Sequence, residues 1–383
     1  MWIYNPFEIG ISGFSGAGKT TLIKKLISTL SDRGLRVGYF KTDAHKFVMD
    51  TPGKDTHVAW EAGATGVSIQ DPIHGASISR DFDPLLHRLE ARNFDRFLVE
   101  GRKHSDLPRL LLLDPRFEID NAIIDEPTIL DRVLALIGPA DQRERANVLG
   151  AEKRLPFFDR DDTQSILEFL DDFWKDSVAP LRGLVLAGGK SRRMGTSKAG
   201  LVYKKGMSQT LVMVSLLRKA GLPVVVSVAE ESQIPQDVRT YIEEDTQVEV
   251  LLDRYPNLGP LSGILSAFDL YRQRGWVVLG CDLPLFSFED LENLIFQRQY
   301  AGYATAYESP VEPGFPEPLA AIYEPKIRSR IFTLFAEGYR CPRKILLQSR
   351  VHLVPARSPQ ALFNANFPHE YEKARLVLSE GVL

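Results

Sequence analysis

Gly13-Phe14-Ser15-Gly16-Ala17-Gly18-Lys19-Thr20 lies between the apolar run 7–11 and the segment 20–31, whose apolar residues recur at helical spacing. A glycine-rich loop of this form between a strand and a helix is typical of P-loop nucleotide-binding proteins. Its glycines let backbone N–H groups surround phosphate oxygens, and the N-terminus of the helix attracts the same negative charge. The stretch therefore predicts a phosphate-binding loop within an α/β fold.

Side chains around this loop fit a nucleotide bound together with Mg²⁺. Lys19 is expected to reach the β and γ phosphates, and Thr20 to supply a hydroxyl to the metal. Glu100 ends a predicted strand and is the first candidate for the carboxylate ligand, and Asp43, which follows the run 35–41, is the second. The predicted nucleotide-binding residues are Gly13, Ser15, Gly16, Ala17, Gly18, Lys19, Thr20 and Thr21.

A second glycine-rich loop follows another apolar run near the middle of the chain. Leu186-Ala187-Gly188-Gly189 is followed by Arg193-Met194-Gly195 and then by Lys198. Backbone N–H groups of the two glycines can approach a nucleotide because no side chain intervenes, and Arg193 and Lys198 offer positive charge to phosphates. This order is typical of nucleotidyltransferases. Because one nucleotide site does not need two such loops, we predict two nucleotide-binding modules.

Length and alternating segments support a division into two α/β domains. The chain has 383 residues, of which 44% are hydrophobic and 25% charged, so it can form two cores. Strand-like and helix-like segments alternate after each loop, which favours parallel sheets covered by helices. We predict a P-loop NTPase-like domain at 1–174, a linker at 175–181 and a Rossmann-like nucleotidyltransferase domain at 182–383.

The elements expected from apolar periodicity are these. In the first module we expect strands at 7–11, 35–41, 95–99, 110–113 and 133–137, and helices at 20–31 and 163–174. In the second we expect strands at 183–187, 224–229, 248–252 and 276–279, and helices at 208–220, 235–242, 262–272 and 288–297.

Charge and cysteine content argue against several classes of protein. The 47 basic and 50 acidic residues nearly cancel, so no general field attracts nucleic acid. No apolar run reaches the ~20 residues of a membrane span. Cys281 and Cys341 are far apart and do not form a disulfide framework. We expect a cytoplasmic protein without nucleic-acid or membrane partners.

Four further stretches of the first module match a known pattern. They are Lys41-Thr42-Asp43-Ala44-His45, Asp50-Thr51-Pro52-Gly53-Lys54-Asp55-Thr56, Leu98-Val99-Glu100-Gly101-Arg102-Lys103-His104 and Pro156-Phe157-Phe158-Asp159. They resemble the MobB family, the GTP-binding accessory proteins of molybdenum cofactor guanylation. The resemblance covers nearly all of 5–174. It implies that GTP and Mg²⁺ bind here, with slow hydrolysis at most, and that the protein forms a homodimer through this module.

Besides its glycine-rich loop, three elements of the second module match a known pattern. They are Asp253 before Gly259-Pro260-Leu261-Ser262-Gly263, then Cys281-Asp282-Leu283-Pro284, and Asn364-Ala365-Asn366-Phe367-Pro368. Together with the loop they resemble the MobA family, the molybdenum cofactor guanylyltransferases. The resemblance implies transfer of GMP from GTP to molybdopterin, with release of pyrophosphate. It also implies partners that deliver molybdopterin and molybdoenzymes that receive the product.

The same resemblance assigns roles to individual residues of the second module. The expected catalytic residues are Lys198, Arg193 and Asp282, with Asp282 also holding Mg²⁺. The expected GTP-binding residues are Leu186, Ala187, Gly188, Gly189, Arg193, Lys198, Asp253 and Asp282. Asn364 and Asn366 are expected on the pterin side.

Two other functions stay open at this point. Cytidylyltransferases that act on the same cofactor tend to carry Leu-Ala-Ala-Gly, and Gly188 at the third position favours guanine instead. Nothing in the first module identifies a phosphoryl acceptor, so the chain could also serve as a GTP-switched carrier or adaptor.

Overall fold

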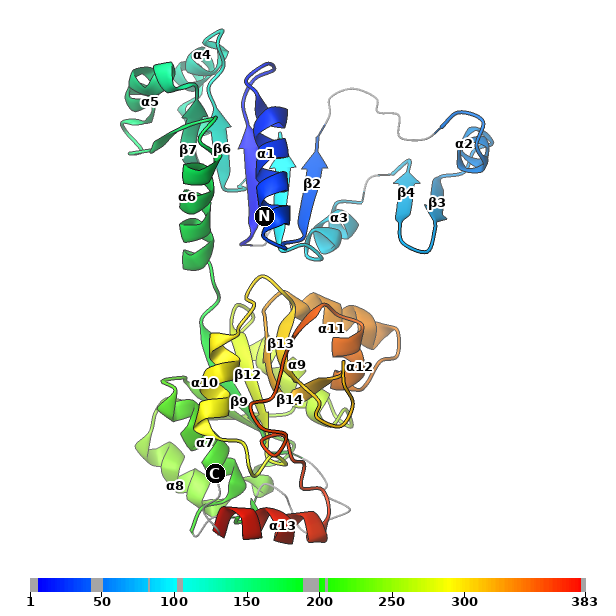
Figure 1. Cartoon of the computed structure of the whole chain (residues 1–383), viewed down its shortest axis with the longest axis vertical. Coiled ribbons are helices and arrows are strands. Elements are labelled where there is room, and N and C mark those ends of the chain that lie inside the picture. Colours follow the sequence, from blue (N-terminus) through cyan, green and yellow to red (C-terminus); the bar gives the residue numbers. More distant parts are fainter. Residues whose placement is uncertain are drawn as a thin grey trace. The chain divides into compact units, whose positions relative to one another are not determined.

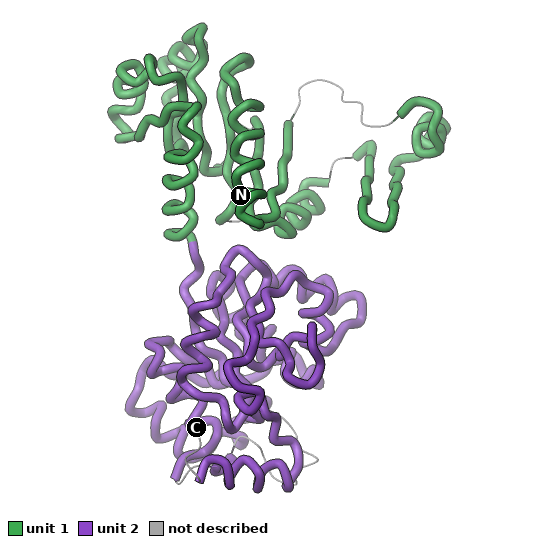
Figure 2. Tube along the Cα trace, viewed as in Figure 1, with its two compact units in different colours: residues 1–177 green, residues 178–383 purple. Residues whose placement is uncertain are grey.

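The computed structural model describes residues 6–42, 51–81, 83–101, 106–188, 200–203 and 206–379. The chain divides into two compact units, Met1–Ser177 and Val178–Leu383 (Figure 2). Each unit is an α/β structure with a sheet of its own (Figure 1). No helix in the described ranges is both long and apolar enough to cross a membrane.

The first unit is built on a six-stranded parallel sheet with the order β2-β5-β1-β6-β7-β8. Its strands are β1 (Glu8–Ser12), β2 (Val37–Lys41), β5 (Arg96–Glu100), β6 (Arg109–Leu112), β7 (Val133–Gly138) and β8 (Phe157–Asp159). Every residue of β1, β5 and β6 is buried, as expected for central parallel strands that are covered on both faces.

In the described residues, five helices of the first unit are eight or more residues long. They are α1 (Lys19–Asp32), α3 (Pro84–Ala91), α4 (Glu118–Asp125), α5 (Arg143–Gly150) and α6 (Thr163–Asp176), with short 3-10 turns η1 (Pro127–Leu130) and η2 (Ala140–Gln142). In α1 the buried residues are Leu22, Ile23, Leu26 and Leu30, which is the helical spacing seen in the sequence. Gly34, at φ 76°, ends α1 in the left-handed conformation.

Residues 51–81 form a small separate arrangement within this unit. Helix α2 (Asp55–Glu61) is followed by the antiparallel pair β3 (Gly66–Gln70) and β4 (Gly75–Ser79). No residue of α2 is buried, and most of both strands is exposed. The Arg80 guanidinium lies 4.2 Å from the centre of the Trp60 ring and donates to the Trp60 carbonyl at 2.7 Å.

The second unit contains a seven-stranded mixed sheet with the order β11-β10-β9-β12-β14-β13-β15. Its strands are β9 (Leu181–Leu186), β10 (Val224–Val228), β11 (Val248–Leu252), β12 (Gly275–Gly280), β13 (Ala304–Glu308), β14 (Pro316–Tyr323) and β15 (Val351–Val354). The strands β11, β10, β9 and β12 are parallel, whereas β14 runs antiparallel to both of its neighbours.

Helices cover both faces of this sheet. They are α7 (Gln209–Lys219), α8 (Gln236–Glu244), α9 (Pro260–Leu270), α10 (Phe288–Phe296), α11 (Ile327–Ala336), α12 (Pro342–Leu347) and α13 (Pro368–Ser379), with the 3-10 turn η4 (Glu231–Gln233). Val185 packs in one core with α7, α8 and α10, and the adjacent Leu184 packs in the other with α9, α11 and α12. This alternation is the two-residue period of a strand buried on both faces.

The expected elements lie within a few residues of those observed. The largest difference concerns the helix expected at 262–272, which spans Pro260–Leu270. Gly259 precedes it at φ 55°, and Pro260 has the φ that the first turn of a helix requires. The strand expected at 35–41 begins at Val37, because the Leu35 N–H donates to the Leu30 carbonyl and closes the end of α1.

Candidate functional site

The first glycine-rich loop joins β1 to α1 at the carboxyl edge of the parallel sheet. Gly13, Gly16 and Gly18 have φ values of 146°, 81° and 92°, which residues with a Cβ seldom adopt. A Cβ on Gly13 would also lie 2.8 Å from a carbonyl oxygen of β6. The loop can therefore lie close to the sheet only with glycine at position 13.

The predicted phosphate-binding residues surround the first turn of α1. Lys19, Thr20 and Thr21 form that turn, and the Lys19 Nζ donates to the Phe14 carbonyl at 2.9 Å, so its ammonium lies across the loop. Ala17 is buried against the sheet, while Ser15 and Gly16 are exposed. The loop thus presents its backbone to solvent at the N-terminus of a 14-residue helix.

Glu100 is placed beside this loop by the pairing of β5 with β1. It is the last residue of β5 and lies in register with Ile11. Its side chain is buried and accepts a hydrogen bond from the Tyr39 hydroxyl at 2.6 Å. Burial and this hydrogen bond to a carboxylate raise the pKa of Tyr39 well above its usual value. Asp43, the second carboxylate candidate, lies outside the described residues.

In the second unit the parallel strands β9, β10, β11 and β12 end at one edge of the sheet. The N–H groups of Ala187 and Gly188, just after β9, both donate to the Ser227 carbonyl, at 2.9 and 3.1 Å. A Cβ on Gly188 would lie 3.0 Å from the Ala229 nitrogen, so glycine lets this loop lie against the end of β10. Gly189, Arg193 and Lys198 lie outside the described residues.

Asp253 directly follows β11 and joins this edge. Its N–H donates to the Val228 carbonyl at 2.9 Å, and its carboxylate accepts a hydrogen bond from the Ser227 hydroxyl. Burial raises the pKa of Asp253, and the Ser227 hydrogen bond opposes that effect. A Cβ on Gly263 would collide with the Ser227 hydroxyl, so glycine lets α9 pack closely beside this group.

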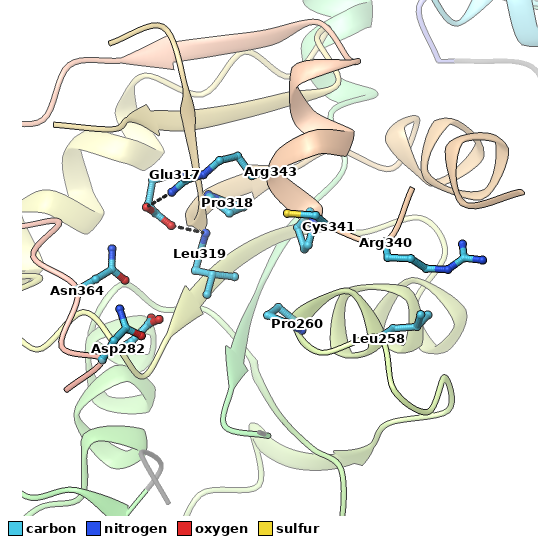
Figure 3. A pocket seen from close by; sticks show the side chains of 12 residues that line it. Leu258, Pro260, Asp282, Glu317, Pro318, Leu319, Arg340, Cys341, Arg343 and Asn364 are labelled. Atoms are coloured by element: carbon cyan, nitrogen blue, oxygen red, sulfur yellow. Dashed lines mark hydrogen bonds and ion pairs between the residues drawn. The ribbon is translucent and has the colours of Figure 1, made fainter. Parts of the chain in front are cut away.

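Asp282, Asn364 and Asn366 line a single cavity of about 500 Å³ (Figure 3). Asp282 follows β12, and the Ala365 N–H donates to the Asp282 carbonyl at 2.8 Å, which holds the two asparagines beside it. The other lining residues are Leu258, Pro260, Glu317, Pro318, Leu319, Arg340, Cys341, Pro342 and Arg343. Asp253 is not among the residues that line this cavity.

The turn after β12 leaves space for the Asp282 carboxylate. A Cβ on Gly280 would lie 2.5 Å from the Asp282 Oδ1. Within the described ranges, no group of three or more His, Cys, Asp or Glu side chains is arranged to hold a metal. A Mg²⁺ ion at Asp282 or Glu100 would therefore take much of its coordination from phosphate oxygens and water, as this ion usually does.

Glu317 is a buried carboxylate of the cavity that was not predicted from the sequence. It accepts from the Leu319 N–H at 3.4 Å, and its Oε2 lies 3.4 Å from the Arg343 Nη2 (Figure 3). Burial raises the pKa of Glu317. The positive charge of Arg343 opposes this shift, and the nearby negative charge of Asp282 adds to it. The cavity thus combines two carboxylates with two arginines, Arg340 and Arg343.

Strand pairing explains why Glu317 could not be predicted as a cavity residue from the sequence. It lies far from the glycine-rich loop in sequence, and it reaches the cavity because β14 runs antiparallel to β12, with Ala320 opposite Leu279. The start of β14 is therefore next to the end of β12. The available signal was a glutamate between Pro316 and Pro318 immediately before an apolar run.

Comparison with known proteins gives two family matches. Residues 8–137 match MobB, described as molybdopterin guanine dinucleotide synthesis protein B, and residues 183–353 match the MobA-like NTP transferase domain. An adapter protein of molybdopterin-guanine dinucleotide biosynthesis from Haemophilus influenzae is 35% identical over 140 residues, which are 33% of this chain and 79% of that protein. A probable molybdenum cofactor guanylyltransferase from Bacillus cereus is 30% identical over 203 residues, 51% of this chain and 96% of that protein. The chain belongs to the MobB and MobA-like families.

Two further proteins are similar to parts of this chain. A molybdenum cofactor biosynthesis bifunctional protein from Synechocystis is 37% identical over 196 residues, which cover 51% of this chain and 54% of that protein. The chain thus spans about half the length of this relative. The crystal structure of molybdopterin-guanine dinucleotide biosynthesis protein A from Archaeoglobus fulgidus is 21% identical, covers 52% of this chain and 99% of its own, and has a TM-score of 0.43.

The fold and the families agree with the sequence analysis. The MobB unit is the P-loop α/β unit, and the MobA-like unit is the nucleotidyltransferase α/β unit. Each family match begins at the strand that leads into a glycine-rich loop, β1 in the first unit and β9 in the second.

Proposed function

We propose that the MobA-like unit transfers GMP from GTP to molybdopterin, which yields molybdopterin guanine dinucleotide and pyrophosphate. The observation that carries this proposal is the convergence of Asp282, Asn364 and Asn366 on one cavity after the end of β12, the strand that pairs with β9, which leads into the second glycine-rich loop. The similar Bacillus cereus protein is named a probable molybdenum cofactor guanylyltransferase, which supports the same substrates.

The chemistry requires positioning and charge neutralisation more than a general base. An oxygen of the acceptor's terminal phosphate attacks the α phosphorus of GTP, and the bond from that phosphorus to the β-phosphate oxygen breaks. The attacking phosphate is already ionised near neutral pH. Arg193 and Lys198 would neutralise the leaving pyrophosphate, and Asp282 would hold a Mg²⁺ ion that supplies further positive charge. Asn364 and Asn366 would orient the acceptor beside Asp282.

The MobB unit is proposed as an accessory GTP-binding module. Gly13 to Thr21 would hold the phosphates, and Thr20 with Glu100 or Asp43 would hold Mg²⁺. We assign residues 1–174 to this module, 182–383 to the transferase and 175–181 to the linker. A cytoplasmic location suits this chemistry.

We also propose that the protein forms a homodimer through the MobB unit. Support comes from α2, none of whose residues is buried, and from the exposed pair β3 and β4. A two-stranded sheet is marginally stable on its own, so a second copy would give these strands a surface to pack against. Sedimentation should show a dimer, and deletion of residues 51–81 should yield a monomer.

Pyrophosphate release tests the proposed reaction. The protein with Mg²⁺ and GTP should release pyrophosphate only when molybdopterin is present. CTP in place of GTP should support little release, because Gly188 occupies the position where cytidylyltransferases tend to carry alanine. Equal or faster release with CTP would reverse the nucleotide assignment. No release with either nucleotide would favour a carrier or adaptor role.

A further inference from the structure

Arg160 lies beside the first glycine-rich loop although it is about 140 residues away in sequence. Its Nη1 is 3.7 Å from the point where a Cβ on Gly18 would stand. Gly18 is the residue that precedes α1, so the guanidinium lies next to the N-terminus of this helix. A bulkier residue at position 18 would meet this side chain.

The backbone around Arg160 is held in place by several contacts. Its N–H donates to the Gly138 carbonyl at 2.8 Å, which ties it to the end of β7. The next residue, Asp161, forms a 2.7 Å ion pair with Lys25 of α1. These contacts link the end of β8 to both the sheet and α1. The position of Arg160 beside the loop therefore follows from the fold of the unit.

The Arg160 guanidinium interacts electrostatically with the neighbouring Asp161, whose carboxylate accepts its hydrogen bond from Lys25 instead. Within the described part of the chain, Arg160 has neither a side-chain hydrogen bond nor an ion pair. The N-terminus of a helix carries a partial positive charge, so a cation there is unfavourable by itself. An anion bound between the two would interact favourably with both.

We propose that Arg160 binds the phosphate chain of a nucleoside di- or triphosphate in the first glycine-rich loop. This inference rests on the nucleotide site proposed for the MobB unit. Arg160 would act from the β8 side, whereas Glu100 lies at the end of β5, on the other side of β1 in the strand order. The site would then have a carboxylate for Mg²⁺ at one end and a second cation, besides Lys19, at the other.

The test measures binding of GDP and GTP to the full chain by calorimetry, with Lys19→Ala used to identify the sites. Arg160→Ala should weaken the Lys19-dependent binding of both nucleotides by roughly 10- to 100-fold, the scale of a charged hydrogen bond to phosphate. Arg160→Lys should lose less because it keeps the charge but not the fork of donors. In the Lys19→Ala background, Arg160→Ala should have no further effect.

Arg116→Ala is the matched control, since Arg116 is an exposed arginine of the same unit with only a 3.8 Å contact to Glu118. It should bind both nucleotides like the wild type. Arg160→Ala binding like the wild type would overturn the inference while leaving the nucleotide site intact. No Lys19-dependent binding in the wild type would instead reject the site and the inference together. An equal loss of nucleotide affinity in Arg160→Ala and Arg116→Ala would show that only the net charge of the unit matters, and this would also overturn the inference.

Discussion

Gly13 and Gly16 belong to the same loop but have different surroundings. Both have a positive φ, yet a Cβ on Gly13 would meet the sheet at 2.8 Å, whereas a Cβ on Gly16 would meet nothing within 4 Å. Gly16→Ala should therefore cost only the backbone penalty, about 1–2 kcal/mol. Gly13→Ala should lower the free energy of unfolding by more, and urea unfolding would measure both. Equal losses would contradict this packing.

Glu317 gives a prediction about pH. Because burial raises its pKa in the folded protein, the folded state binds a proton more tightly than the unfolded chain does. The contribution of Glu317 to the free energy of unfolding is fully present below its ordinary pKa of 4.5. This contribution is lost as the pH rises through the higher pKa that Glu317 has in the folded protein. Glu317→Gln should lack this loss, so the variant should gain stability relative to the wild type from about pH 4.5 upward.

Unfolding of both proteins at a series of pH values measures this difference. A constant difference across the range would contradict the burial of an ionisable carboxyl at position 317. Glu308→Gln, at a half-buried position of β13, is a second variant that measures the effect of removing a carboxyl group elsewhere in the same sheet.

For single residues, local sequence motifs predicted some members of the cavity and not others. Asp282 stands directly after a strongly apolar strand in a recognisable turn, so its placement at the sheet edge followed from sequence. Glu317 and Arg343 are brought to the same cavity only by strand pairing and by the position of α12. Neither has a local pattern that marks it as part of a site.

Among the elements near the cavity, α10 begins six residues after Asp282, and its N-cap residue Ser287 forms a capping box. Ser287 Oγ accepts from the Asp290 N–H at 3.2 Å, and the Asp290 carboxylate accepts from the Ser287 N–H at 2.9 Å. Ser287→Ala should lower the free energy of unfolding by about 1 kcal/mol. Ser379→Ala, at the exposed end of α13, should change it by less than about 0.5 kcal/mol. Thermal unfolding distinguishes the two variants. An unchanged stability of Ser287→Ala would contradict the capping interaction.

Elements with continuous apolar runs or helical periodicity were predictable, and others were not. Strands such as β9 and β12 are buried on both faces and therefore read as apolar runs. The pair β3 and β4 is mostly exposed, so no alternation marks it. The buried strand β14 contains Pro316 and Pro318, and because proline is uncommon within sheets, its sequence does not predict a strand.

For the whole molecule, we predict two nucleotide sites that can be disabled separately. Asp282→Ala should reduce guanylyl transfer by about 100-fold or more, the scale of losing one major electrostatic contact, while nucleotide binding at the MobB unit persists. Lys19→Ala should remove that binding and leave catalysis by the MobA-like unit. Pyrophosphate release and calorimetry on each variant measure the two properties. Equal loss of both properties in either variant would contradict the separation of the sites.

The two-unit organisation was visible in the sequence because each unit begins with its own strand and glycine-rich loop. The order in which the later strands of each sheet pair could not be predicted from the sequence. The mixed half of the second sheet depends on long-range pairing of β12 with β14 and of β13 with β15, and periodicity carries no information about such partners.

The most direct test of the central claim is the mass of the pterin product after incubation of the full chain with Mg²⁺, GTP and molybdopterin. The account predicts a molybdopterin species that has gained GMP, formed by the wild type and not by Asp282→Ala. Molybdopterin recovered at its original mass from a wild-type protein that binds GTP would contradict the proposed transfer.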